Sequence, residues 1–145
     1  MFLGRFEHRL DEKGRLALPT KFRPRLAEGF VVTRGFEPCL TIYPLPEWQV
    51  LADGLAKFPV TDQKARALRR VLFAQATGAE LDRQGRVLLP EYLRQAAGLG
   101  QDVIVAGMDS YLELWDKARW EAVEAEQDEH AAEIAQSLAD LRFEG

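Results

Sequence analysis

A ten-residue segment occurs twice in this chain of 145 residues. Residues 10–19 read LDEKGRLALP and residues 81–90 read LDRQGRVLLP, so six of the ten positions are identical at a spacing of 71 residues. Such self-similarity identifies tandem repeats, and each related unit here spans about 45 residues. The match extends beyond the segment, since Arg23, Gly35, Leu40 and Trp48 correspond to Arg94, Gly107, Leu112 and Trp120.

Each unit alone is near the size at which a core of its own is only marginally stable, whereas 145 residues suffice for one good core. The composition, 47% hydrophobic and 29% charged, is that of an ordinary globular protein. No stretch approaches the roughly 18 apolar residues of a membrane span. We therefore expect the two halves to share a single core.

The N-terminal segment lacks the apolar run of a signal peptide, because Arg5, Glu7 and Arg9 interrupt it. We therefore expect a cytoplasmic protein. The single cysteine, Cys39, has no partner for an internal disulfide, and it corresponds to Tyr111 in the second half. Cys39 is expected to be a buried, inert thiol at a packing position.

Charge is divided unevenly along the chain. The formal net charge is −4, yet residues 1–25 hold seven Lys or Arg against three Asp or Glu, a balance of +4. Residues 61–94 have a balance of +3, with seven against four, and residues 113–145 have −7, with three against ten. The local field decides which partners a protein attracts. Charged runs are often only solvated faces, but here the two basic segments carry the repeated motif.

Alternation of side-chain character predicts a strand over residues 2–10. Turn residues follow, and residues 15–18 are expected to return as the second strand of a hairpin, which Pro19 ends. The second half repeats this plan. The other predicted strands cover residues 30–33, 39–43, 75–81, 86–89, 103–106 and 111–115.

Four segments carry helical signals. Residues 61–73 begin with Thr61 as the predicted N-cap and expose a basic face. Residues 116–142 contain no Gly or Pro and repeat apolar side chains every three to four positions above an acidic face. Shorter helices are predicted at 46–58 and 90–97.

The repeated segment has the chemistry of a tight turn. Asp11 and Asp82 can accept hydrogen bonds from the backbone that follows them, and Gly14 and Gly85 adopt positive φ without steric cost. These four residues are therefore predicted to support the turns.

A turn does not require the arginine that follows it, yet Arg15 and Arg86 occupy equivalent places in both halves. Each has a second cation on its turn, Lys13 or Arg83. A guanidinium binds phosphate or guanine through two parallel hydrogen bonds, and the neighbouring Asp can orient it with its free edge outward. The predicted DNA-binding residues are Arg15, Arg86, Lys13, Arg83, Arg5 and Arg9, and Lys21, Arg23 and Arg94 could enlarge this surface.

An enzyme is one alternative, because two halves that each supply an Asp could form a carboxylate dyad, as in aspartic proteases. The neighbouring residues oppose this, since cations beside Asp11 and Asp82 lower the carboxyl pKa values instead of keeping a shared proton. His8 and His130 are isolated, and the sequence has no cysteine pair or Gly-rich phosphate loop. We expect no enzymatic activity, cofactor, metal, membrane or small-molecule substrate.

The order of residues resembles the MraZ family of bacterial transcriptional regulators over essentially the whole chain. The acidic tail beyond about residue 121 is the least diagnostic part. The matching motifs are MFxG at residues 1–4, LDxKGRLxLP at 10–19, CLxIYP at 39–44 with Trp48, and LDxQGR at 81–86.

This resemblance implies a mainly β fold with flanking helices (α+β). Two AbrB-like (SpoVT-AbrB) swapped-hairpin halves would form one pseudo-two-fold β-barrel, followed by a long C-terminal helix. The implied units are a DNA-binding repeat at 5–48, a helical connection at 49–75, a second DNA-binding repeat at 76–120 and an acidic helix at 121–145.

The resemblance also implies a nucleoid-associated, ring-like homo-oligomer. That assembly would repress transcription at direct repeats in double-stranded DNA, upstream of its own cell-division and cell-wall gene cluster. The remaining alternative is an antitoxin-like or scaffold module of the same barrel fold, with a protein partner and no operator. Such a module has no need to repeat Arg15 as Arg86, although the acidic helix could recruit a partner in addition.

Overall fold

The computed structural model describes residues 1–144, with side chains for residues 1–141. Position 145, the end of the predicted acidic helix, lies outside the described residues. The strands are β1 (Arg5–Arg9), β2 (Arg15–Ala17), β3 (Phe30–Arg34), β4 (Leu40–Pro44), β5 (Thr77–Ala79), β6 (Arg86–Leu88), β7 (Asp102–Gly107) and β8 (Leu112–Asp116). The helices are the 3-10 helix η1 (Thr20–Leu26) and the α-helices α1 (Leu45–Ala56), α2 (Gln63–Leu72), α3 (Glu91–Ala96) and α4 (Lys117–Glu144).

The two halves are interleaved within one antiparallel sheet, whose strand order is β1-β7-β8-β4-β3-β5. β1 lies beside β7 of the second half, with Arg5 opposite Ala106. Reciprocally, β5 lies beside β3 of the first half, with Ala79 opposite Phe30. Exchanging the two halves leaves this strand order unchanged.

The predicted hairpin of β1 with β2 is wrong. In the described chain a single bridge, between Leu10 and Leu16, joins these segments, and β2 pairs with β6 in a separate two-stranded sheet. β2 has only three residues before Pro19, which has no N–H to donate, so it cannot pair along the five residues of β1. The six-residue β7 offers β1 a partner of full length.

Two strand pairs lie on the pseudo-two-fold axis. In the β2–β6 pair, Leu16 faces Val87, its own counterpart 71 residues later. In the β4–β8 pair, Thr41 faces Glu113, its counterpart 72 residues later. A residue that faces its own counterpart lies on the axis that relates the halves, so the predicted pseudo-two-fold arrangement is confirmed.

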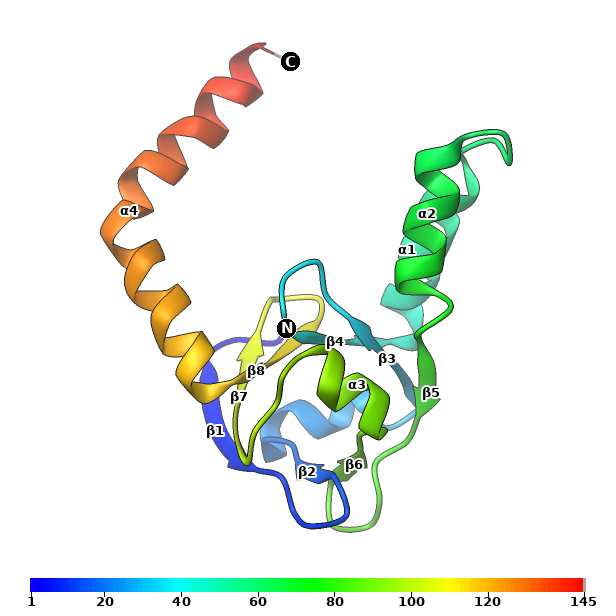
Figure 1. Cartoon of the computed structure of the whole chain (residues 1–145), viewed down its shortest axis with the longest axis vertical. Coiled ribbons are helices and arrows are strands. Elements are labelled where there is room, and N and C mark those ends of the chain that lie inside the picture. Colours follow the sequence, from blue (N-terminus) through cyan, green and yellow to red (C-terminus); the bar gives the residue numbers. More distant parts are fainter. Residues whose placement is uncertain (145) are drawn as a thin grey trace.

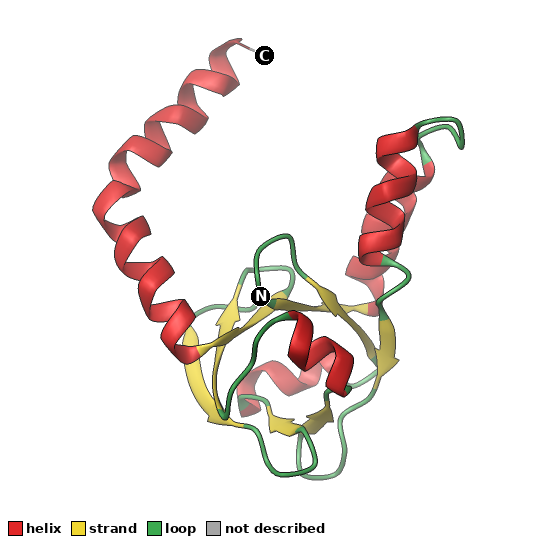
Figure 2. Cartoon of the chain, in the orientation of Figure 1, coloured by secondary structure: helices red, strands yellow, loops and turns green. Residues whose placement is uncertain are grey.

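The expected barrel is not closed, although the mainly β class with flanking helices is confirmed. β1 and β5 are the free edges of the six-stranded sheet. Figure 2 shows the curved strands arranged around the short helices η1 and α3. These helices place Phe22, Leu26, Leu93 and Ala97 in the core. Their side chains therefore fill the space between the strands that a closed barrel would enclose by strand pairing.

One hydrophobic core serves both halves, as predicted. The first half supplies ten of its buried residues and the second half supplies eight, so neither half has this core to itself. The residues are Phe2, Leu10, Leu16, Leu18, Phe22, Leu26, Phe30, Val32, Leu40, Ile42, Val87, Leu89, Leu93, Ala97, Val103, Val105, Leu112 and Leu114.

Two helical arms leave the sheet on opposite sides and point the same way (Figure 1). One arm is the α1–α2 pair, and the other is α4, of which only the first turns reach the body. There Trp120 and Val123 pack against Cys39, Ile104 and Trp115. None of the helices in residues 1–144 combines the length and apolar character needed to cross a membrane.

The N-cap of α2 is Asp62 rather than the predicted Thr61. The Asp62 backbone is extended, and its carboxylate accepts a hydrogen bond from the Ala65 N–H at 3.0 Å. Both residue types cap helices well. The Asp62 N–H donates to the Pro59 carbonyl at 2.9 Å, and this turn makes Asp62 the last residue before the helix.

Candidate nucleic-acid interface

The two copies of the repeated motif form equivalent turns, here called tip 1 (residues 11–15) and tip 2 (residues 82–86). In tip 1, the Asp11 carboxylate accepts hydrogen bonds from the N–H groups of Lys13 and Arg15, both at 2.9 Å. In tip 2, the Asp82 carboxylate accepts the equivalent bonds at the same distances. The tips lie side by side at the end of the body opposite the helical arms (Figure 1).

Gly14 and Gly85 close these turns with φ values of +80° and +75°, as predicted for turn-forming glycines. Each also leaves room for an arginine of the other half. A Cβ atom on Gly14 would lie 2.9 Å from Nε of Arg94, and one on Gly85 would overlap the guanidinium of Arg23.

Arg23 and Arg94 therefore join the halves. Arg23 Nε donates to the Leu18 carbonyl at 3.0 Å, and Arg94 Nε donates to the Leu89 carbonyl at 2.9 Å. The sequence revealed their equivalence through their common spacing, but it suggested only an enlarged basic surface. Their contact with the turn of the opposite half was not predicted.

The tip arginines are oriented by their own aspartates, as predicted. Arg15 Nε lies 2.6 Å from Asp11 Oδ2, and Arg86 Nε lies 2.9 Å from Asp82 Oδ2. Asp11 also lies 3.8 Å from Arg86 Nη1, so this carboxylate faces the arginines of both tips. The two side chains remain 31% and 27% exposed, which leaves their guanidinium groups in contact with solvent.

The carboxylates of Asp11 and Asp82 have lowered pKa values, in the direction predicted from the neighbouring cations. The largest cause differs from the predicted one, because it is the hydrogen bond from the backbone N–H of Arg15 or Arg86. The arginine side chains add to this effect. Both aspartates are therefore ionised partners of arginine, unlike a catalytic dyad that shares a proton.

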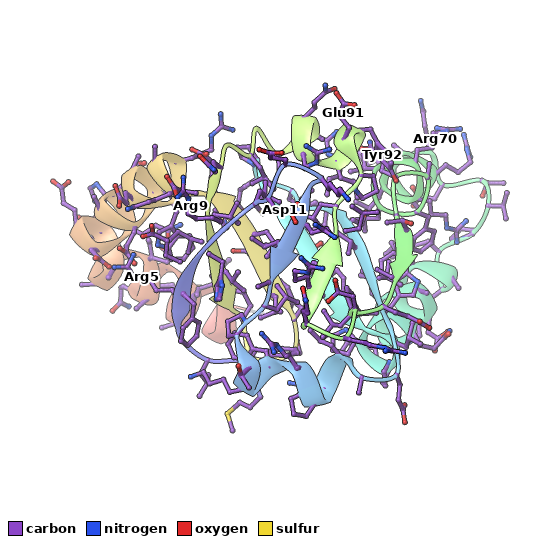
Figure 3. All side chains as sticks on the ribbon, turned by 90° about the horizontal axis from the view of Figure 1, so that it is seen from below. Arg5, Arg9, Asp11, Arg70, Glu91 and Tyr92 are labelled. Atoms are coloured by element: carbon purple, nitrogen blue, oxygen red, sulfur yellow. The ribbon has the colours of Figure 1, made fainter. Side chains whose placement is uncertain are left out.

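The other predicted cations occupy two regions. Lys13 and Arg83 are exposed on the tips themselves. Arg9 Nε pairs with Asp102 Oδ1 at 3.3 Å, and Arg5 Nη1 pairs with Glu124 Oε1 of α4 at 3.0 Å. Figure 3, which looks onto the tip end, shows Asp11 near the centre, with Arg9 displaced toward α4 and Arg5 farther out at α4. Arg5 therefore does not gather with the tips.

Other chemistry-bearing side chains behave as packing or surface groups. Cys39 is buried, and desolvation together with Glu113 raises the pKa of its thiol to about 12, which agrees with an inert thiol. His8 is half-buried with a lowered pKa, caused mainly by burial, and His130 lies 3.3 Å from Glu133. Residues 1–144 contain no group of three or more His, Cys, Asp or Glu arranged to hold a metal ion.

Comparison with known proteins identifies the family. The family described as "MraZ protein, putative antitoxin-like" matches twice, over residues 1–71 and 72–142. A transcriptional regulator MraZ of Roseiflexus castenholzii is 46% identical over 143 residues, 99% of this chain and 100% of that protein. Another, of Herpetosiphon aurantiacus, is 52% identical over 123 residues, 85% of this chain and 86% of that protein. With two family matches, an internal pseudo-two-fold axis and paired tips, this chain belongs to the MraZ family of transcriptional regulators.

Proposed function

We propose that this chain is a sequence-specific DNA-binding repressor. It acts at direct repeats upstream of its own cell-division and cell-wall gene cluster, and it is associated with the nucleoid. The observation that carries the proposal is the pair of tips, which place two oriented arginines and two further exposed cations at one end of the molecule.

The contacts of Arg15 and Arg86 suit DNA recognition. In each, Nε is bonded to the neighbouring aspartate, and the side chain as a whole remains 31% exposed for Arg15 and 27% exposed for Arg86. An arginine held in this way loses less side-chain entropy on binding than a free one. Its remaining donors fit phosphate oxygens, or the O6 and N7 acceptors of guanine in the major groove.

The distribution of charge favours approach of DNA from the tip end. α4 carries eight acidic residues against three basic ones, and it projects from the opposite end of the body (Figure 1). DNA on the tips therefore lies away from the acidic arm. The antiparallel β2–β6 pair behind the tips is a two-stranded element, and the major groove is wide enough to admit such an element.

The helical arms support self-association, which we propose produces a ring-like homo-oligomer. On α4 the side chains of Ile134, Leu138 and Leu141 form an apolar stripe, each between 46% and 63% exposed. On the other arm, α2 carries four basic residues and no acidic one. An acidic, apolar arm and a basic arm on opposite sides of one chain suit head-to-tail contact between copies.

A binding titration tests the function. A labelled duplex from upstream of the gene is titrated with the full chain at about 50 mM and about 200 mM salt, beside a scrambled duplex. We expect tighter binding to the natural duplex at both concentrations, and weaker binding to both duplexes at higher salt because counterions are released on binding. Equal affinity for natural and scrambled duplexes would contradict a sequence-specific regulator.

An antitoxin-like interaction module is the second candidate, favoured by the exposed apolar stripe of α4. The two candidates differ in whether the effect of the protein on transcription depends on α4 or on the tips. If the protein acts only through a protein partner, changing Leu138→Glu abolishes its effect on transcription while Arg15→Ala leaves that effect intact. The DNA-binding proposal predicts loss of repression with Arg15→Ala.

A further inference from the structure

The two tips have the same backbone but different exposed side chains. Their hydrogen bonds correspond one to one, including Gly14 N–H to the Asp11 carbonyl at 3.1 Å and Gly85 N–H to the Asp82 carbonyl at 3.0 Å. The Asp, Gly and Arg residues that build each turn are identical. The two positions between Asp and Gly differ, because Glu12 and Lys13 in tip 1 stand where tip 2 has Arg83 and Gln84.

These four side chains have no part in holding the turns. All four are exposed, and among the contacts of residues 1–141 none of their side chains forms a hydrogen bond or an ion pair. At these positions the backbone N–H groups of Lys13 and Gln84 donate to the turn aspartates, which leaves the side chains uninvolved. The varied positions are therefore free to contact a partner.

The pseudo-two-fold axis determines the symmetry of the DNA sequence that two identical tips would read. The axis passes through the Leu16–Val87 pair, between the tips, and DNA has its own two-fold axes perpendicular to the helix. Two identical tips related in this way would read identical half-sites on opposite strands, which is an inverted repeat. Unequal tips read unequal half-sites, so their recognition sequence has a direction.

The side chains of these four residues have different hydrogen-bonding preferences for the edges of bases. A glutamate accepts a hydrogen bond from N4 of cytosine, whereas arginine and lysine donate to guanine and glutamine binds adenine through two bonds. Glu12 and its counterpart Arg83 therefore have opposite charge and opposite hydrogen-bonding character. In addition, tip 1 has no net charge while tip 2 carries +1, so the tips also differ in attraction to phosphate.

We propose that the Glu12–Lys13 and Arg83–Gln84 pairs read different base pairs and give each subunit a directional recognition site. This inference rests on the proposed DNA-binding function. It supplies a physical reason for operators built of direct repeats: each asymmetric chain reads one asymmetric site, and copies arranged head to tail read successive sites in the same direction.

Selection from random DNA tests the inference without knowledge of the operator. Duplexes with one randomised helical turn, about 10 base pairs, are enriched on the full chain and sequenced. We expect the parent chain to enrich an asymmetric sequence. A self-complementary consensus for the parent would overturn the inference while leaving DNA binding intact. The absence of any enriched sequence would instead overturn the proposed function itself.

Two double variants make the tips equal. E12R/K13Q gives both tips the Arg–Gln pair, and R83E/Q84K gives both the Glu–Lys pair. Each should enrich a self-complementary sequence and bind it about 5- to 150-fold more tightly than the parent's sequence, the range for one base contact. If both variants keep the parent's asymmetric consensus, these positions do not read bases and the inference fails.

Matched control variants distinguish loss of base recognition from the effects of altered net charge and of altered folding. E129Q on α4 raises the net charge by one, as E12R/K13Q does, and K57Q beyond α1 lowers it by one, as R83E/Q84K does. Glu129 belongs to α4 and Lys57 directly follows α1, so both changes are on the arms, which leave the body at the end opposite the tips (Figure 1). These controls should keep the parent's asymmetric consensus, and all variants should melt within a few degrees of the parent because the altered side chains are exposed.

Discussion

The guanidinium of Arg94 lies directly over Gly14, the turn glycine of the other half, so that a Cβ atom there would be 2.9 Å from Arg94 Nε. Arg23 has the same relationship to Gly85. The tips are thereby fixed to each other through the helices of the opposite halves. A change at either glycine consequently affects both its own turn and the contact between halves.

Gly14→Val and Gly85→Val should each lower the free energy of unfolding by about 1 kcal/mol or more. The reasons are strain at positive φ and collision with the covering arginine. Urea denaturation measures the effect. Gly54→Ala is the control, because Gly54 lies within α1 with open space around it, and its substitution should leave stability equal or higher. Unchanged stability of both valine variants would contradict the described turns.

Arg15→Ala and Arg86→Ala should weaken operator binding and leave folding nearly intact. A lost base contact costs roughly 1 to 3 kcal/mol at the cognate site, whereas a lost phosphate contact weakens binding to all sequences alike. Exposed ion pairs contribute only about 0 to 1 kcal/mol to stability, so the melting temperature should barely move. Arg34→Ala, on β3, is the matched control, because it removes the same charge outside the tips and the helical arms. Tight binding by both folded tip variants would exclude these arginines from the interface.

The lowered pKa values of Asp11 and Asp82 predict a defined loss of stability in acid. A carboxyl whose pKa is lower in the folded chain stabilises the fold above its unfolded pKa, near 3.8, and loses this contribution as the pH falls further. Asp11→Asn should therefore be less stable than the parent at neutral pH. The difference should shrink below 3.8. Urea denaturation across this range measures it, and a difference that is independent of pH would refute the prediction.

Cys39 should resist alkylation in the folded protein. Its thiol is buried and has a pKa of about 12, so little thiolate forms near neutral pH. Iodoacetamide should label the chain only after unfolding in urea, as detected by mass spectrometry. Rapid labelling of the native chain would show that the cluster under the base of α4 opens readily.

Binding should depend on several subunits acting together. One chain offers few tip cations, so its affinity for a single site is expected to be weak at physiological salt, on the order of 10⁻⁴ to 10⁻⁶ M for nonspecific contacts. Linked subunits that engage adjacent repeats gain about 10² to 10⁴ in affinity. Titration against one, two and three repeats measures the gain, and displacing one repeat by half a helical turn should remove it. Equal affinity for single and tandem sites would rule out cooperation between subunits.

Local patterns predicted most of the fold. Every strand and α-helix lies within three residues of its predicted ends, because alternation, capping residues and prolines act over short distances. The internal repeat predicted two equivalent halves with a shared core, and the family resemblance implied their pseudo-two-fold arrangement. Strand partners were harder to predict. The choice of β7 over β2 for β1 depends on segments about 100 residues apart, which no local pattern encodes.

At the tips, too, the local turn structure was predicted from the sequence, whereas the contacts between the two halves were not. The turn chemistry of Asp11 and Gly14 was predictable because the bonds join residues within four positions of one another. The role of Arg23 was not, because its contact with Gly85 exists only once the halves have docked. Arg5 was grouped with the tips by its charge, but its ion pair is with Glu124 on α4, which only the tertiary structure brings near.

The exchange of strands between halves has a consequence for synthesis. β1 ends at Arg9, whereas its partner β7 ends at Gly107, so β1 leaves the ribosome well before β7 is complete. At about 5 to 20 residues per second, the nascent chain carries an unpaired strand for roughly 5 to 20 s. During that interval the first half has neither its sheet partner nor its shared core. An unpaired strand edge of this kind is prone to aggregation, so the delay between β1 and β7 exposes the emerging chain to that risk.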